Sequence, residues 1–261
     1  MDPLYTLSKP LMGATVLKRP SSSIKSPYVA DVRLDDGLIV LCHTPGLGCC
    51  GLVEAGRRIY VYEGSAGSKT ACVTFLAECR DADGVFYNGI HPMISQNAAR
   101  GLLPRISAEA TWAAEVRVSD ETRLDYVGTL PNGKKIYVEV KNAMISLEDD
   151  KPRSERRAIF PEGFRKKAGE PVSPRAVKHA QTLASLLSKE DTEACCLLFT
   201  VPRTDCADGM TINIRDPIYY DAVLKAVRAG VRVYAFSLAF GLDGTVRFGR
   251  SLPFYINLID N

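Results

Sequence analysis

The stretch RLDYVGTLPNGKKIYVEVKN, residues 123–142, contains two β-rich segments separated by the turn-forming tripeptide Pro-Asn-Gly. In the second segment apolar and polar side chains alternate, and successive side chains of a strand point to opposite faces. One face would therefore be aliphatic, and the other would carry Lys135, Tyr137, Glu139 and Lys141. The pattern predicts a β-hairpin in which Glu139 and Lys141 are neighbours.

The length of the turn decides which side chain lies opposite Glu139. A three-residue loop over 131–133 sets Asp125 directly across from Glu139, where two like charges destabilise the hairpin unless something compensates. A divalent cation would compensate, because Mg²⁺ prefers oxygen ligands, commonly one or two carboxylates together with water and a substrate phosphate. Lys141, on the same face, would then hold an attacking water or a phosphate oxygen.

Two other interpretations of the hairpin stay open at this level. A two-residue loop of Asn132 and Gly133 is an equally common hairpin signal, and it would oppose Asp125 to Val140 and turn the carboxylate to the other face. The polar face is also compatible with ordinary solvated surface on a half-buried strand.

Composition indicates a folded protein of ordinary globular type. The 261 residues are 46% hydrophobic and 24% charged, which suits one large domain or two small ones. The longest apolar runs, such as residues 38–42 and 195–199, are far shorter than the ~20 residues of a membrane span, so we expect no membrane segment. Because the first residues do not form a secretory signal, we expect the eight cysteines to be reduced in the cytoplasm.

Positive charge is concentrated in one segment, although the net charge is only +3. Residues 151–179 contain nine Lys or Arg against three Glu. Such a segment favours polyanions electrostatically, and it is equally compatible with a solvated loop. The residues expected to contact nucleic acid are Arg156, Arg157, Arg165, Lys166 and Lys167.

Two regions differ in their pattern of elements. Residues 27–87 contain short β-rich segments separated by glycine, which predicts a small barrel and fits a five-stranded oligonucleotide-binding (OB) barrel. From residue 89 the pattern predicts a helix over 93–103, a meander of strands, an exposed excursion over 142–173, and then helix, strand, helix and strand. The predicted fold class is α/β, or α+β for the chain as a whole, with a mixed sheet centred on the hairpin.

The order of helix, three strands, helix and strand, together with Asp…Glu-x-Lys, resembles the PD-(D/E)xK nuclease superfamily, in which this motif binds divalent metal for phosphodiester hydrolysis. Along nearly its whole length the chain also resembles the sugar fermentation stimulation (SfsA) family. That resemblance is carried by residues 29–46, 51–61, 123–126, 137–142, 158–162, 175–187, 197–203, 214–236 and 248–254.

The family resemblance implies an N-terminal OB-like domain that binds nucleic acid, over residues 1–88, and a restriction-endonuclease-like domain over residues 89–261. It also implies binding to DNA without strong sequence preference, and a regulatory role in sugar, notably maltose, metabolism. Neither the residue pattern nor the resemblance predicts an oligomeric state.

By motif position, Asp125 and Glu139 would bind the metal, Mg²⁺ or Mn²⁺, and Lys141 would complete the catalytic set. The resemblance further implies supporting positions at Asn142, Lys178 and His179, and a nucleic-acid contact at His43 in the N-terminal signature.

The chain departs from the family pattern in the helix before the meander. The family usually offers a carboxylate to the metal there, whereas this sequence has Gln96 and Asn97. Glu115, on the first meander strand, would substitute if its side chain points to the same face. Two functions follow: a metal-dependent nuclease acting on DNA or RNA, and a DNA-binding protein that keeps the fold without the chemistry, which the missing carboxylate favours.

Overall fold

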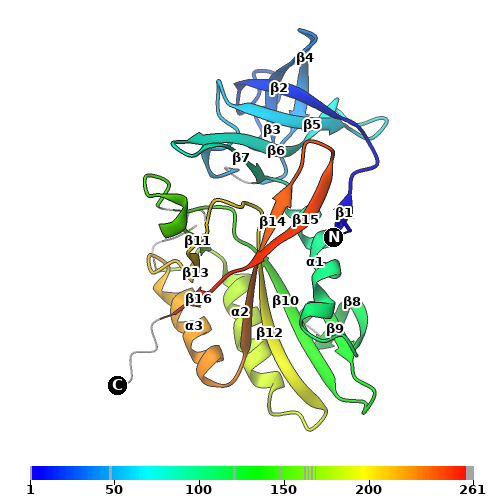
Figure 1. The fold of residues 1–261 in the computed structure, drawn as a ribbon, viewed down its shortest axis with the longest axis vertical. Coiled ribbons are helices and arrows are strands. Elements are labelled where there is room, and N and C mark those ends of the chain that lie inside the picture. Colours follow the sequence, from blue (N-terminus) through cyan, green and yellow to red (C-terminus); the bar gives the residue numbers. More distant parts are fainter. Residues whose placement is uncertain are drawn as a thin grey trace.

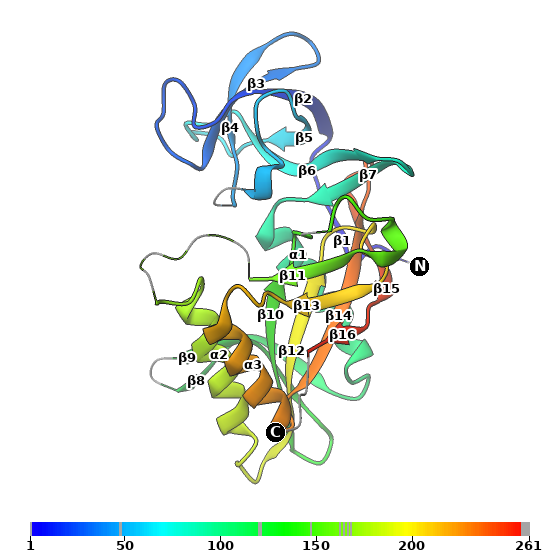
Figure 2. The ribbon, with the colours of Figure 1, turned by 90° about the vertical axis from the view of Figure 1, so that its left-hand side faces the viewer.

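The computed structural model describes residues 2–46, 49–119, 122–146, 148–161, 163, 165, 167 and 169–256. Figure 1 shows a barrel of strands at one end of the molecule and a larger sheet flanked by helices at the other. In the turned view of Figure 2 the barrel again lies beyond one end of the larger sheet.

The barrel is a closed ring of strands. They follow the order β4-β3-β2-β5-β6, and a parallel pairing of β4 with β6 closes the ring, as an OB-like barrel requires. The strands are β2 (Leu11–Lys18), β3 (Val29–Leu34), β4 (Ile39–His43), β5 (Arg58–Glu63) and β6 (Cys72–Asp81), with β7 (Gly84–Gly89) added beside β6 and the 3-10 helix η1 (Cys49–Gly51) between β4 and β5. The predicted barrel is confirmed, although β2 precedes the segment from which it was predicted.

The larger sheet is mixed, and its order among the described residues is β1-β15-β14-β12-β10-β9-β8. The central strands β10, β12 and β14 are parallel, and the remaining pairings are antiparallel. The strands are β1 (Tyr5–Thr6), β8 (Thr111–Ser119), β9 (Thr122–Thr129), β10 (Lys135–Asn142), β12 (Thr192–Val201), β14 (Arg232–Phe240) and β15 (Thr245–Ser251). The predicted α/β class with a mixed sheet is thus confirmed.

Helices cover both faces of this sheet. The helix α1 (Pro92–Ala99), continued by the 3-10 helix η2 (Arg100–Arg105), packs on one face, and α2 (Pro174–Leu186) with α3 (Pro217–Arg228) packs on the other (Figure 1). Both α2 and α3 begin as the sequence predicts, because Ser173 and Asp216 accept the N–H groups of Ala176 and Tyr219 and a proline follows each cap.

Three short strands form a separate parallel sheet that was not predicted. They are β11 (Arg157–Phe160), β13 (Gly209–Ile212) and β16 (Phe254–Tyr255), and the 3-10 helix η3 (Arg153–Glu155) precedes β11. Residues 142–173 were expected to be an exposed excursion, but Ala158 and Ile159 of β11 are buried. A second difference concerns Tyr5, which pairs with Val246 in the larger sheet although it belongs to the segment assigned to the barrel.

Within the described ranges, no helix combines the length and the apolar character that a membrane crossing requires.

Candidate functional site

The predicted hairpin is present, and its register is that of a three-residue loop. Leu130 and Lys134 face each other across the turn, with the Leu130 N–H donating to the Lys134 carbonyl at 2.8 Å, and the ladder continues to Val138 opposite Tyr126. At the next step the strands part, and the Val140 N–H donates to the carboxylate of Asp125 at 2.7 Å. Asp125 therefore reaches across to the backbone between Glu139 and Lys141.

The second strand of the hairpin lies inside the molecule. Helices cover both faces of the sheet, so the side chain of Tyr137 is buried and Glu139 is only 2% exposed. This burial excludes the interpretation of the polar face as solvated surface.

The two oxygens of Glu139 have different surroundings. Oε1 accepts hydrogen bonds from Lys141 Nζ and from His179 Nδ1, and these two nitrogens are 3.4 Å apart. Oε2 is buried and has no hydrogen-bond partner among the residues that the structure describes. Burial opposes ionisation of Glu139, but the hydrogen bond from His179 and the charge of Lys141 outweigh it and lower its pKa.

Asp125 experiences the opposite balance. Burial and the nearby charge of Glu139 raise the pKa of Asp125 from 3.8 to about 6, although the hydrogen bond from the Val140 N–H favours the charged form. The carboxylate also accepts a hydrogen bond from Gln96 Nε2 on α1 at 2.8 Å.

Gln96 connects Asp125 with Glu115. Its Nε2 atom is 3.5 Å from Glu115 Oε1, so Glu115 does point to the amide that contacts Asp125. Glu115 lies in β8 at the position opposite Asp125, where the ladder between β8 and β9 is interrupted and Glu115 has a φ of 53°. Its side chain is 56% exposed. Asn97, the other amide on α1, is exposed.

A cavity of about 170 Å³ adjoins these groups. The residues that line it come from α1, β10 and β12, and they are Pro92, Gln96, Val140, Lys141, Asn142 and Thr200. Asn142 accepts a hydrogen bond from Thr200 Oγ1 at 3.2 Å, while its buried Nδ2 has no partner within the described part of the chain. Lys141 and Asn142 therefore both border the cavity.

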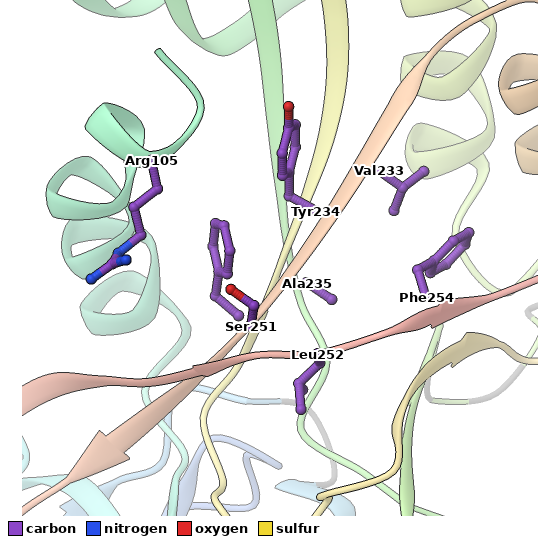
Figure 3. Close-up of a pocket in the computed structure, with 8 residues that line it drawn as sticks. Arg105, Val233, Tyr234, Ala235, Ser251, Leu252 and Phe254 are labelled. Atoms are coloured by element: carbon purple, nitrogen blue, oxygen red, sulfur yellow. The ribbon is translucent and has the colours of Figure 1, made fainter. Parts of the chain in front are cut away.

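A larger cavity, of about 400 Å³, lies beside β14 (Figure 3). Arg105 of η2 approaches it from one side, and the chain from Ser251 to Phe254 borders the other. None of the candidate residues predicted from sequence is among the described residues that line it.

Helix α2 places its two predicted residues differently. His179 is 4% exposed and contacts Glu139, whereas Lys178 is exposed. Arg175, which was not among the residues predicted for the site, donates from Nε to His179 Nε2 at 3.4 Å. The spacing in the sequence could have indicated this contact, because Arg175 and His179 are four residues apart and such residues are neighbours on a helix.

The basic segment does not form one exposed surface. Arg156 is 4% exposed and its guanidinium binds Asp81 and Asp205 at 2.6 and 3.0 Å, which contradicts the expected phosphate contact. Arg157 is half-buried, pairs with Asp208 and stacks over Tyr255.

Arg165 and Lys167 are exposed, and Arg165 donates to the Arg215 carbonyl. Lys166 lies outside the described residues.

His43 lies in the barrel, at the end of β4. It is half-buried and close to His91, whose pKa is lowered to about 4 by burial and by the charge of His43. His91 is the N-cap residue of α1 and stacks with Tyr62 at a centroid distance of 6.4 Å. The stacking of His91 on Tyr62 connects the barrel to the helix that carries Gln96.

The donor set can be tested for its fit to a metal ion. Across the described residues, no three His, Cys, Asp or Glu side chains converge in a group that could hold one. Two carboxylates, one of them with a buried oxygen that has no partner in the described ranges, therefore suit an ion that keeps several waters rather than one that needs a complete protein cage.

The mixed sheet, its flanking helices and the acidic hairpin define a domain of the restriction-endonuclease (RE) type. Residues 89–244 match the family model described as the sugar fermentation stimulation protein RE domain. The chain belongs to the sugar fermentation stimulation protein family.

Relatives of this family align with the chain over most of their length. The homologue of this family in Synechocystis sp. is 29% identical over 89% of this chain and 91% of its own length. The homologue in Thioalkalivibrio sulfidiphilus is 30% identical over 80% of this chain and 82% of its own length. The structure of Pyrococcus furiosus SfsA in complex with Ca²⁺ has the same fold, with a TM-score of 0.74, 22% identity, and coverage of 98% of this chain and all of that one.

Proposed function

We propose that this protein is a nuclease that depends on a divalent metal and hydrolyses phosphodiester bonds in DNA or RNA. The observation that carries the proposal is the unpartnered Oε2 of Glu139, buried beside Lys141 and on the strand next to Asp125, with no hydrogen-bond partner in the described chain. A buried carboxylate oxygen without a partner is destabilising, and a cation would satisfy it. The complex of Pyrococcus furiosus SfsA with Ca²⁺ supports a divalent ion.

In this proposal Asp125 and Glu139 hold Mg²⁺ or Mn²⁺, which would supply Lewis acidity at the scissile phosphate and lower the pKa of a bound water. Lys141 borders the cavity and offsets the charge that develops on the phosphate oxygens. Gln96 holds the Asp125 carboxylate from α1.

The exposed residues Arg165 and Lys167, together with His43 in the barrel, are the proposed contacts to the polyanion. Arg156 is not among them, because its buried guanidinium forms ion pairs with Asp81 and Asp205.

The test is cleavage of labelled single-stranded and duplex DNA and of RNA, with and without Mg²⁺ or Mn²⁺. We expect cleavage by the wild type only when metal is present, and none by Asp125→Ala. The matched control is Asp191→Ala, because Asp191 is a half-buried carboxylate that pairs with Lys135 at the other end of β10. Cleavage that survives in Asp125→Ala would reject these roles.

One observation favours a second function, a DNA-binding protein without catalysis that regulates sugar, notably maltose, metabolism. The α1 side chain that contacts Asp125 is the neutral amide of Gln96. In that case DNA binding needs no metal, weakens steeply as salt increases, and is unchanged in Glu139→Gln. Filter binding in EDTA over a salt series separates the two functions.

A further inference from the structure

We infer that His179 is a positioning residue, which holds Glu139 by Oε1 so that Oε2 is left for the metal. This inference rests on the proposed metal site. It assigns to His179 a contact with a carboxylate rather than with a phosphate.

Two donors converge on one oxygen of Glu139. His179 Nδ1 and Lys141 Nζ both contact Oε1, and the two nitrogens lie 3.4 Å apart. The side chains of His179 and Glu139 are 5% and 3% exposed, so water does not compete for these contacts. With Oε1 occupied twice, a ligand entering the site meets Oε2, which has no partner among the described residues.

Arg175 fixes the tautomer of His179. Its Nε donates to His179 Nε2 at 3.4 Å, and a guanidinium nitrogen has no acceptor function. Nε2 must therefore accept, which places the proton of the neutral imidazole on Nδ1, where it is donated to Glu139. Arg175 and His179 are four residues apart on α2, so one helix face presents both.

The helix that carries the pair is anchored firmly. Ser173 caps its N-terminus, and Ala176, Ala180 and Leu183 are buried against the sheet. Helix α2 therefore holds His179 in a fixed position beside Glu139. Residues that orient a metal ligand in this way affect metal affinity by about 10-fold to 100-fold when they are removed.

The experiment is a titration with Mn²⁺ by calorimetry on the wild type and four variants. His179→Ala removes the donor, and we expect the Kd to rise by about 10-fold to 100-fold. His179→Asn keeps an N–H at the position of Nδ1, and we expect an affinity close to wild type. Arg175→Ala, at an exposed site, frees the tautomer and should weaken binding by less than His179→Ala. Gln181→Ala, on an exposed position of the same helix, is the matched control and should bind as the wild type does.

Thermal unfolding of each variant establishes that it is folded. If the wild type binds Mn²⁺ and His179→Ala binds equally well, the positioning role is wrong while the metal site stands. If His179→Asn is as weak as His179→Ala, then His179 acts by packing, and the hydrogen-bond role is rejected. If the wild type itself binds no Mn²⁺, the proposed metal site fails, and the inference fails with it.

Discussion

Asp125 and Glu139 are carboxylates on neighbouring strands, yet their surroundings move their pKa values in opposite directions. Glu139 has two cationic or hydrogen-bonding partners on one oxygen, and these outweigh burial. Asp125 is buried beside the charge of Glu139, and its donors among the described residues are neutral, the Val140 N–H and the Gln96 amide. The residue that the metal would have to neutralise is therefore Asp125.

A stability measurement can detect how much the ionised carboxylate of Asp125 destabilises the folded state. Its folded pKa of about 6 lies above its value of 3.8 in the unfolded chain, so the folded state binds the proton more tightly. The free energy of unfolding then falls as pH rises from about 4 to 6, and stays lowered above that. In EDTA at pH 7.5 we expect Asp125→Asn to be more stable than the wild type, by at most about 3 kcal/mol.

At pH 4 the difference between Asp125→Asn and the wild type should nearly vanish, because the wild-type carboxyl is then protonated. Denaturant unfolding at both pH values checks this. A variant less stable than the wild type at pH 7.5 would show that the hydrogen bonds to the carboxylate outweigh its buried charge.

Glu115 has a strained backbone conformation. A φ of 53° is left-handed, and an L-residue there loses about 1–2 kcal/mol relative to its ordinary conformation. We expect Glu115→Gly to raise the free energy of unfolding by about 1 kcal/mol, because glycine adopts this conformation without a clash. Glu115→Ala is the control: it also loses the exposed 3.9 Å ion pair with Arg123, but it keeps the Cβ and should gain nothing. Equal stability of the two variants would contradict the strain.

Sequence reasoning reached some of these residues and not others, for a physical reason. Glu139 and Lys141 follow from strict alternation within one strand, which is a local property. The burial of Arg156 depends on Asp81 and Asp205, which are distant in the sequence, so a count of local charge could not predict it. The contact between Gln96 and Asp125 likewise depends on how α1 packs on the sheet.

At the scale of elements, the hairpin was predicted well and the short parallel strands were not. Turn chemistry and alternation fix the hairpin between adjacent segments, whereas β11 pairs with β13, about 50 residues later in the chain. The alternation of β10 gave the right faces but left open whether its polar face is buried, and helices on both sides of the sheet bury that face as well.

The turn of the hairpin offers a prediction at this scale. Gly133 has a φ of 84°, and a Cβ placed there meets no atom of the described residues within 4 Å, so the effect of a substitution is conformational. We expect Gly133→Ala to lower the free energy of unfolding by about 1 kcal/mol. Gly133→Asn should lower it by less, since asparagine tolerates left-handed backbone. Chemical denaturation measures both, and equal losses would mean that the side chain and not the backbone matters.

At the scale of the whole molecule, ion pairs join the barrel to the rest of the chain. Asp81, at the end of β6, binds Arg153 at 2.7 Å and Arg156 at 2.6 Å. Arg156 in turn shares Asp205 with Arg203, whose side chain is buried beyond β12. Figures 1 and 2 show β6 and β7 at the side of the barrel that faces the larger sheet. The network fixes the barrel relative to the sheet that carries the candidate site.

Removing one partner of this network should be costly because it leaves buried Arg156 with less compensation. We expect Asp81→Ala to lower the free energy of unfolding by about 3 kcal/mol, and Asp83→Ala by less than about 1 kcal/mol. Asp83 is the matched control, on the same hairpin and 3.8 Å from Arg153 but 58% exposed.

Hydrogen bonds from Arg153 and Arg156 hold the pKa of Asp81 well below its usual range. Its contribution is therefore present above about pH 4 and is lost as pH falls through the folded pKa. The advantage of the wild type over Asp81→Ala should therefore be smaller at pH 3 than at pH 7, and denaturant unfolding at the two pH values measures this decrease. Equal losses in Asp81→Ala and Asp83→Ala at pH 7 would show that these ion pairs do not hold the barrel in place.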